Sequence, residues 1–104
     1  MTPKLVRDRI PDIIIANGEH PITRRLDDAA YHDALRAKLR EEVDEYLGAP
    51  DDAAGVEELV DILEVIQALT AVHGANVEWL EMKRAEKARE RGGFSERVFL
   101  IDVE

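Results

Sequence analysis

Apolar residues recur three and four positions apart before the middle of the chain, which is the spacing that places them on one face of an α-helix. The stripe consists of Leu35, Leu39, Val43, Tyr46 and Leu47. Gly48 and Pro50 follow it, and both residue types commonly end helices. We therefore predict an amphipathic helix over residues 29–47, with Asp27 or Asp28 as its N-cap.

The next stretch is apolar around almost its whole circumference. Its apolar residues are Leu59, Val60, Ile62, Leu63, Val65, Ile66, Leu69 and Val72. A helix of this kind is normally buried, so we predict a buried helix over residues 53–73, capped by Asp51 or Asp52. Because a short connection joins it to the preceding helix, the two helices are expected to form an antiparallel hairpin.

Shorter elements are predicted on either side of this hairpin. A proline in the first turn and an Asn-Gly stop predict a helix over residues 11–16. Asn76 suits the N-cap of a fourth helix that ends at Arg91, before two glycines. Apolar residues alternate in the C-terminal tail, which predicts a short β-strand over residues 97–102 that pairs with an extended segment at residues 21–26.

The predicted fold class is all-α, a helical bundle built on the antiparallel hairpin, with the two short strands added to it. The chain has 104 residues, which is the length of one domain, so we expect a single domain over residues 1–104. A chain of this length buries only a marginal core. We therefore expect oligomerisation, as a homodimer or homotetramer, to complete the bundle.

Composition excludes several classes of function. The net charge of −9 argues against binding nucleic acid or an anionic membrane, because both depend on Lys and Arg at phosphates. The absence of cysteine excludes disulfides, thiolate metal sites and a cysteine nucleophile. No apolar run reaches the ~18 residues of a membrane span, and no apolar signal segment follows the first residues. We therefore expect a cytoplasmic protein.

Acidic residues are concentrated in one stretch. Between Glu41 and Glu64 the chain holds ten Asp and Glu residues and no Lys or Arg. Two patterns in it mirror each other across the predicted turn, and residues three apart on a helix are neighbours. Both patterns lie about 8 Å from the turn at 1.5 Å per residue. We predict that four carboxylates converge there, those of Glu42, Glu45, Glu58 and Asp61.

Glu42 lies three residues after Leu39 and seven after Leu35, on the apolar face of its helix. A buried carboxylate needs a cation, a Lys or Arg partner, or a proton. Because the acidic stretch contains no basic residue, we predict a hard divalent cation with oxygen ligands, Mg²⁺ or alternatively Mn²⁺. Acidic runs on helices are also commonly solvated faces, and that interpretation stays open.

Two groups of basic residues flank the acidic stretch and are candidate phosphate contacts. The first recurs every four residues along one face of the predicted fourth helix and comprises Lys83, Lys87 and Arg91. The second stands near the N-terminus and comprises Lys4, Arg7 and Arg9. The alternatives are a solvated helix face for the first group and local ion pairs for the second.

The acidic pattern resembles the signature of the all-α nucleoside triphosphate pyrophosphohydrolases, the MazG-like superfamily. This superfamily includes phosphoribosyl-ATP pyrophosphohydrolase and the dimeric dUTPases. The signature here reads EEVDE, a gap of twelve residues, and ELVD. The flanking segments KLVRDRIPDII and RGGF resemble a subgroup of small proteins labelled phosphoribosyl-ATP pyrophosphohydrolase-like. The resemblance covers nearly the whole chain.

The resemblance implies a Mg²⁺-dependent hydrolase that cleaves between the α- and β-phosphates and yields a nucleoside monophosphate and pyrophosphate. It implies metal ligands at Glu42, Glu45, Glu58 and Asp61. Glu41, with Glu42, is the implied catalytic pair, Glu41 as the base that orients water. It also implies dimers or tetramers whose site is completed across subunits.

The leading hypothesis from the sequence is a house-cleaning pyrophosphohydrolase that acts on canonical or damaged nucleoside triphosphates. One alternative is phosphoribosyl-ATP pyrophosphohydrolase of histidine biosynthesis, which acts on a phosphoribosyl-nucleotide. Another, of a different class, is a non-catalytic module that binds a metal or a nucleotide, or dimerises.

Overall fold

The computed structural model describes residues 2–104 and contains four α-helices. These are α1 (Ile10–Ala16), α2 (Asp28–Leu47), α3 (Asp52–Val72) and α4 (Val77–Arg91). Every helix begins and ends within one residue of its predicted bounds, so the all-α prediction is confirmed. In residues 2–104 no helix is long and apolar enough to cross a membrane.

Side-chain caps fix the start of the three longer helices. Asp27 accepts a hydrogen bond from the backbone N–H of Ala30, and Asp51 accepts one from that of Ala54, both at 2.8 Å. Asn76 caps α4 in the same way. Each cap satisfies one of the backbone donors that a helix leaves free in its first turn. The caps therefore set where the two hairpin helices begin, and with that the level at which their side chains face each other.

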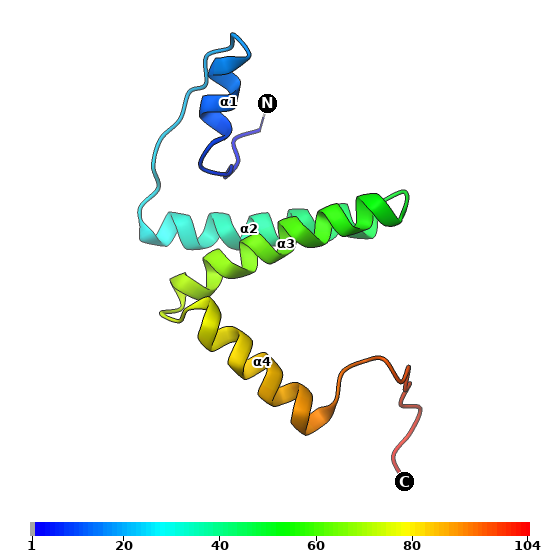
Figure 1. Cartoon of the computed structure of the whole chain (residues 1–104). Helices are drawn as coiled ribbons and strands as arrows, with labels where there is room; N and C mark the ends of the chain where they lie inside the picture. Colours follow the sequence, from blue (N-terminus) through cyan, green and yellow to red (C-terminus); the bar gives the residue numbers. More distant parts are fainter. Residues whose placement is uncertain (1) are drawn as a thin grey trace.

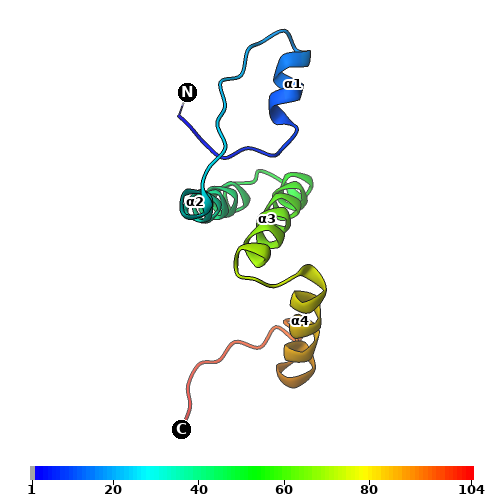
Figure 2. The same ribbon diagram turned by 90° about the vertical axis from the view of Figure 1, so that its left-hand side faces the viewer.

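The α2–α3 hairpin is the centre of the molecule, and Figures 1 and 2 show the two helices side by side. Leu35 of α2 and Val65 of α3 are the buried apolar residues, with 4% and 8% of their surface exposed. Near the open end, the rings of His32 and His73 meet edge to face at 5.4 Å between centroids. The hairpin prediction is confirmed by this packing.

The other helices spread away from the hairpin and do not form a bundle with it. In Figures 1 and 2, α1 lies on one side of the hairpin and α4 on the other. Within residues 2–104, α4 packs against α3 only, and α1 packs against no helix. The radius of gyration is 17.8 Å, against about 13 Å for a compact domain of this length. Within the described residues of one chain, the hairpin therefore forms as predicted, but the other helices do not complete a bundle around it.

Two predictions are wrong for the described residues. Helix α3 is not buried, because α2 covers one side of it and Leu59 and Leu63 on other parts of its surface are about half exposed. The strands predicted at residues 21–26 and 97–102 are absent from residues 2–104. The first segment precedes α2 on one side of the hairpin and the second follows α4 on the other side, so they cannot pair within one chain (Figure 1).

Candidate metal centre

Three carboxylates meet where the two hairpin helices face each other. Glu42 comes from α2, and Glu58 and Asp61 come from the facing surface of α3, one turn apart. One oxygen of each lies within 4.8 Å of the other two. The antiparallel hairpin therefore brings together three of the four carboxylates that the sequence predicts to converge.

Glu42 is the buried member of this cluster, with 5% of its surface exposed. Its Oε1 lies 3.2 Å from the ammonium nitrogen of Lys38. Its Oε2 has no hydrogen-bond partner among residues 2–104, and the same is true of Glu58 Oε2. A buried carboxylate oxygen without a partner costs free energy, so these two atoms are positioned to accept a cation or a proton.

Lys38 is a functional candidate that sequence reasoning missed. It lies four residues before Glu42 on the same helix face, and its ammonium also lies 3.4 Å from Glu41. Desolvation lowers the pKa of Lys38, but the hydrogen bond to Glu42 and the charges of Glu41 and Glu42 outweigh it and raise the pKa. The prediction that Glu42 lacks a basic partner is wrong, because Lys38 lies just before the acidic stretch and contacts Glu42 from one turn earlier on the same helix. The i, i+4 spacing of Lys38 and Glu42 was the available signal.

The basic partner of Asp61 comes from a distant part of the chain. The guanidinium of Arg7 donates a hydrogen bond to Asp61 Oδ1 at 2.6 Å, across 54 positions of sequence. This contact places the segment before α1 over the middle of the hairpin. Arg7 was predicted as a phosphate contact with local ion pairs as the alternative, and its partner is instead a member of the acidic cluster.

Glu58 is the carboxylate with the strongest shift in its titration. Burial and the neighbouring carboxyl groups of Glu45 and Glu42 raise the pKa of Glu58 to about 7 from its ordinary value of 4.5. Glu45 itself is exposed and lies beside Glu58, outside the group of three whose oxygens approach one another. Below about pH 7 the carboxyl group of Glu58 therefore holds a proton, which a divalent cation can replace.

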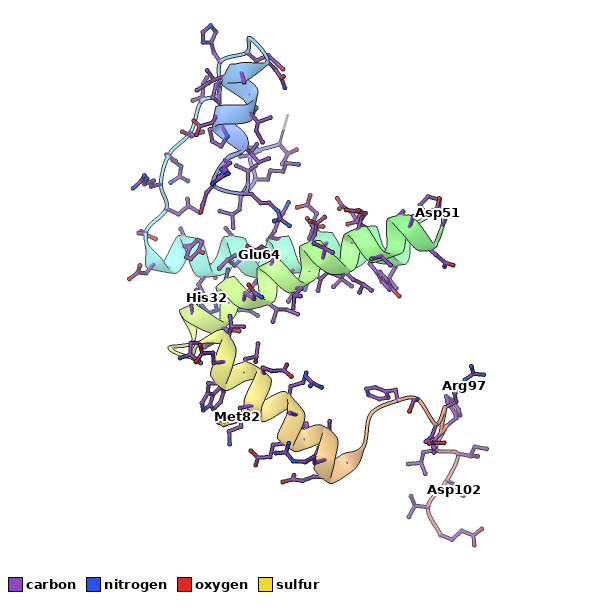
Figure 3. The ribbon with its side chains drawn as sticks, viewed as in Figure 1. His32, Asp51, Glu64, Met82, Arg97 and Asp102 are labelled. Atoms are coloured by element: carbon purple, nitrogen blue, oxygen red, sulfur yellow. The ribbon has the colours of Figure 1, made fainter. Side chains whose placement is uncertain are left out.

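A groove of about 530 Å³ opens beside the cluster, between the N-terminal segment and the hairpin. Three of its lining residues are basic, namely Arg7, Arg9 and Lys38, and Glu42 and Asp61 line it as well. Glu64, which Figure 3 labels at mid-hairpin, lines the same groove. Leu35, Val65 and Tyr31 supply an apolar wall. The groove thus combines acidic, basic and apolar surface, as expected where a charged small molecule binds.

The basic residues of α4 lie elsewhere in this chain. Lys83 is 3.7 Å from Glu86 and lies over the Trp79 ring, 5.6 Å from its centroid. Lys83 and Lys87 line a different groove on α4, the helix on which Figure 3 labels Met82, and Arg91 is exposed at the end of this helix. Lys4 is exposed and does not line the acidic groove. Within one chain, the structure does not bring this set to the carboxylates.

The residues of the cluster fit a hard divalent cation. All the converging donors are carboxylate oxygens, which Mg²⁺ and Mn²⁺ prefer, and two buried oxygens lack partners among residues 2–104. The cluster carries three formal negative charges when ionised, of which Lys38 and Arg7 offset two. A divalent cation is therefore compatible with both the atoms and the charge at this position.

Comparison with known proteins finds a relative of part of the chain. An uncharacterized protein of Mycolicibacterium smegmatis (strain ATCC 700084 / mc(2)155) is 50% identical over 54 residues, which is 52% of this chain. The matched region spans 55% of that protein's length, so the chain covers about half of the relative. No family model and no solved structure matches the chain.

Proposed function

We propose that the protein is a Mg²⁺-dependent nucleoside triphosphate pyrophosphohydrolase of the cytoplasm. The observation that carries the proposal is the buried carboxylate of Glu42, which has one oxygen without a partner in residues 2–104 and lies close to Glu58 and Asp61 across two facing helices. A carboxylate in this position has little structural value, because burying a charge costs free energy. A cation-binding role gives a reason for it to be there.

The proposed cation ligands are Glu42, Glu58 and Asp61, with Glu45 beside them. When bound, the divalent cation neutralises phosphate charge and acidifies water. Glu41, half-exposed at the edge of the cluster, accepts the proton of the attacking water in this proposal. The ammonium nitrogen of Lys38 lies 3.4 Å from the carboxylate of Glu41.

Phosphate oxygens of the substrate require positive partners beyond the cation. Arg7, Arg9 and Lys38 line the groove beside the carboxylates and are the proposed contacts from the same chain. We propose that Lys83, Lys87 and Arg91 reach the groove from α4 of a second copy, in a homodimer or homotetramer. Support for this comes from the open arrangement of the chain, in which α4 points away from its own hairpin (Figure 1).

The exposed apolar surface of α3 favours one other function, a dimerisation module without catalysis. Val56, Leu59, Val60 and Leu63 are about half exposed. Contiguous apolar surface of this kind marks an interaction site. This function accounts for the apolar face but gives no role to the buried Glu42, so we place it second.

The test is release of pyrophosphate with Mg²⁺ over a panel of canonical and damaged nucleoside triphosphates and phosphoribosyl-ATP. We expect turnover in the wild type and loss of it in Glu42→Gln, beyond the about 10- to 100-fold effect of residues that only support metal ligands. Asp44→Asn is the matched control, because Asp44 is an exposed acid two residues away on the same helix. Absence of turnover with every substrate at high protein concentration, with both proteins folded, contradicts the enzyme and leaves the dimerisation module.

A further inference from the structure

Arg7 makes an unusual contact for a residue in an extended segment. Among the side-chain hydrogen bonds of residues 2–104, its bond to Asp61 joins residues 54 apart, whereas the others join residues at most four apart. Helix α1, which follows Arg7, packs against no other helix within the described residues. The position of the N-terminal segment over the hairpin therefore depends largely on Arg7 and on the half-buried Leu5 and Val6.

Asp61, the partner of Arg7, also belongs to the cluster of three carboxylates. Asp61 lies within 4.8 Å of Glu42 and Glu58 and is one of the three proposed cation ligands. A divalent cation among these oxygens repels a guanidinium on the same carboxylate, because like charges a few ångströms apart interact unfavourably. Both partners of the Arg7–Asp61 pair are partly exposed, so the pair is weak enough for a cation to displace.

We propose that a divalent cation displaces Arg7 from Asp61, and that the released guanidinium of Arg7 then binds the phosphate groups of the bound molecule. We call this displacement the exchange. This inference rests on the cation site of the proposed function and names a residue that couples that site to the ligand. Arg7 lines the groove between the N-terminal segment and the hairpin, so release from Asp61 leaves its guanidinium inside the groove.

The exchange makes cation and phosphate binding reinforce each other. Without the cation, the guanidinium of Arg7 is hydrogen-bonded to Asp61 and is not available to donate to a phosphate group. Once the cation holds Asp61, the guanidinium is available for a bidentate contact with phosphate oxygens. By linkage, a phosphate ligand that holds Arg7 must also tighten cation binding by the same factor.

The first measurement is calorimetric titration of the full chain with Mn²⁺ alone, in the wild type, Arg7→Ala and Arg9→Ala. We expect Arg7→Ala to bind Mn²⁺ about two- to fivefold more tightly, because the competing ion pair is gone. Arg9→Ala is the charge-matched control, since Arg9 lines the same groove but makes no ion pair with Asp61 in the structure. In saturating Mn²⁺, Arg7→Ala should bind inorganic pyrophosphate more weakly than the wild type.

The second measurement follows the N-terminal segment directly. The chain contains no cysteine, so spin labels at Thr2→Cys and Ala71→Cys report one distance, in samples diluted with unlabelled protein to remove contributions from other copies. Both positions are exposed. We expect Mg²⁺ to broaden or shift the distance distribution in the otherwise wild-type chain. In Arg7→Ala the distribution should already be broad, and Mg²⁺ should change it little.

The outcomes separate this inference from the cation site itself. Equal Mn²⁺ affinity in the wild type and Arg7→Ala, or an unchanged label distance with Mg²⁺, overturns the exchange while the cation site stands. Equal tightening by Arg9→Ala also overturns it, because the effect is then one of overall charge. If neither the wild type nor Arg7→Ala binds Mn²⁺, the cation site fails and the exchange fails with it.

Discussion

Lys38 forms an ion pair with Glu42 but contacts only one of its two carboxylate oxygens. Lys38 holds one oxygen of Glu42 at 3.2 Å, and the other oxygen has no partner in the described part of the chain. Glu42 is almost fully buried, whereas the Lys38 side chain keeps 19% of its surface exposed. Loss of the lysine is therefore expected to leave a buried charge, whereas loss of the carboxylate leaves a lysine that still has Glu41 and solvent.

This asymmetry gives a prediction for stability. Lys38→Met should destabilise the protein by about 3 kcal/mol in metal-free buffer, because it removes one partner of a buried pair, whereas Glu42→Gln should change stability by less than about 1 kcal/mol. Mg²⁺ should recover part of the loss in Lys38→Met by supplying positive charge. Urea unfolding with and without Mg²⁺ measures both effects. An equally large loss in Glu42→Gln indicates that the carboxylate is mainly structural.

Glu58 gives a prediction for pH. Its folded pKa of about 7 lies above the ordinary 4.5, so the folded state holds a proton that the unfolded state releases between these values. The contribution of this group to stability therefore falls as pH rises from about 4.5 to 7. Comparison of thermal unfolding of the wild type and Glu58→Gln in EDTA isolates the effect. The difference between them should grow with pH in favour of the variant, and a constant difference contradicts the shift.

At the scale of single residues, the sequence predicted part of the candidate metal site. The three-, four- and seven-residue spacing placed Glu42 on the apolar face, and it is buried as expected. Arg7 was predicted to contact phosphate or to form a local ion pair, and its contact with Asp61 was not predicted, because a contact across 54 positions depends on how the N-terminal segment folds back. Glu45 was predicted on equal terms with Glu42, but it lies on the exposed edge, and helical spacing alone does not fix how deep a residue sits.

At the scale of elements, the helix boundaries depend on residues that act locally. Asp, Asn, Gly and Pro determine where helices start and stop through backbone hydrogen bonds and allowed dihedral angles, so the four helices could be predicted to within one residue. Strands depend on a partner from elsewhere in the chain. The alternation at residues 97–102 indicated a strand, but within one chain the partner segment lies across the hairpin (Figure 1).

The cap of α3 is testable because the next residue is also an aspartate. Asp51 accepts a hydrogen bond from the backbone N–H of Ala54 at 2.8 Å, so Asp51→Ala should destabilise the protein by about 1 kcal/mol. Asp52 is the first residue of α3, and Asp52→Ala removes a favourable charge near the helix dipole, which is expected to cost about 0.5 kcal/mol. Chemical unfolding of both variants measures the difference. Equal losses contradict the assignment of Asp51 as the cap.

At the scale of the whole molecule, the apolar pattern predicted burial that one chain does not provide. The sequence of α3 is apolar all round, yet α2 covers only one side of it and α4 touches it at its end. Periodicity tells which residues prefer to be buried and not whether the covering surface belongs to the same chain. A radius of gyration of 17.8 Å is consistent with an arrangement whose core lies between copies.

The proposed oligomer predicts the effect of a charge on this surface. Leu63 is 54% exposed in the chain, on the part of α3 that α2 leaves uncovered. Leu63→Glu should dissociate the oligomer and lower its melting temperature, because a carboxylate in an apolar interface loses its hydration without gaining a partner. Sedimentation velocity over a range of protein concentrations measures the association.

The control is Ala53→Glu, which adds the same charge to an exposed site in the first turn of α3, where the helix dipole favours it. Ala53→Glu should keep the association of the wild type. A wild type that stays monomeric at every concentration contradicts the oligomer. It then also contradicts the supply of α4 basic residues from a second copy, and leaves Arg7, Arg9 and Lys38 as the positive groups of the groove.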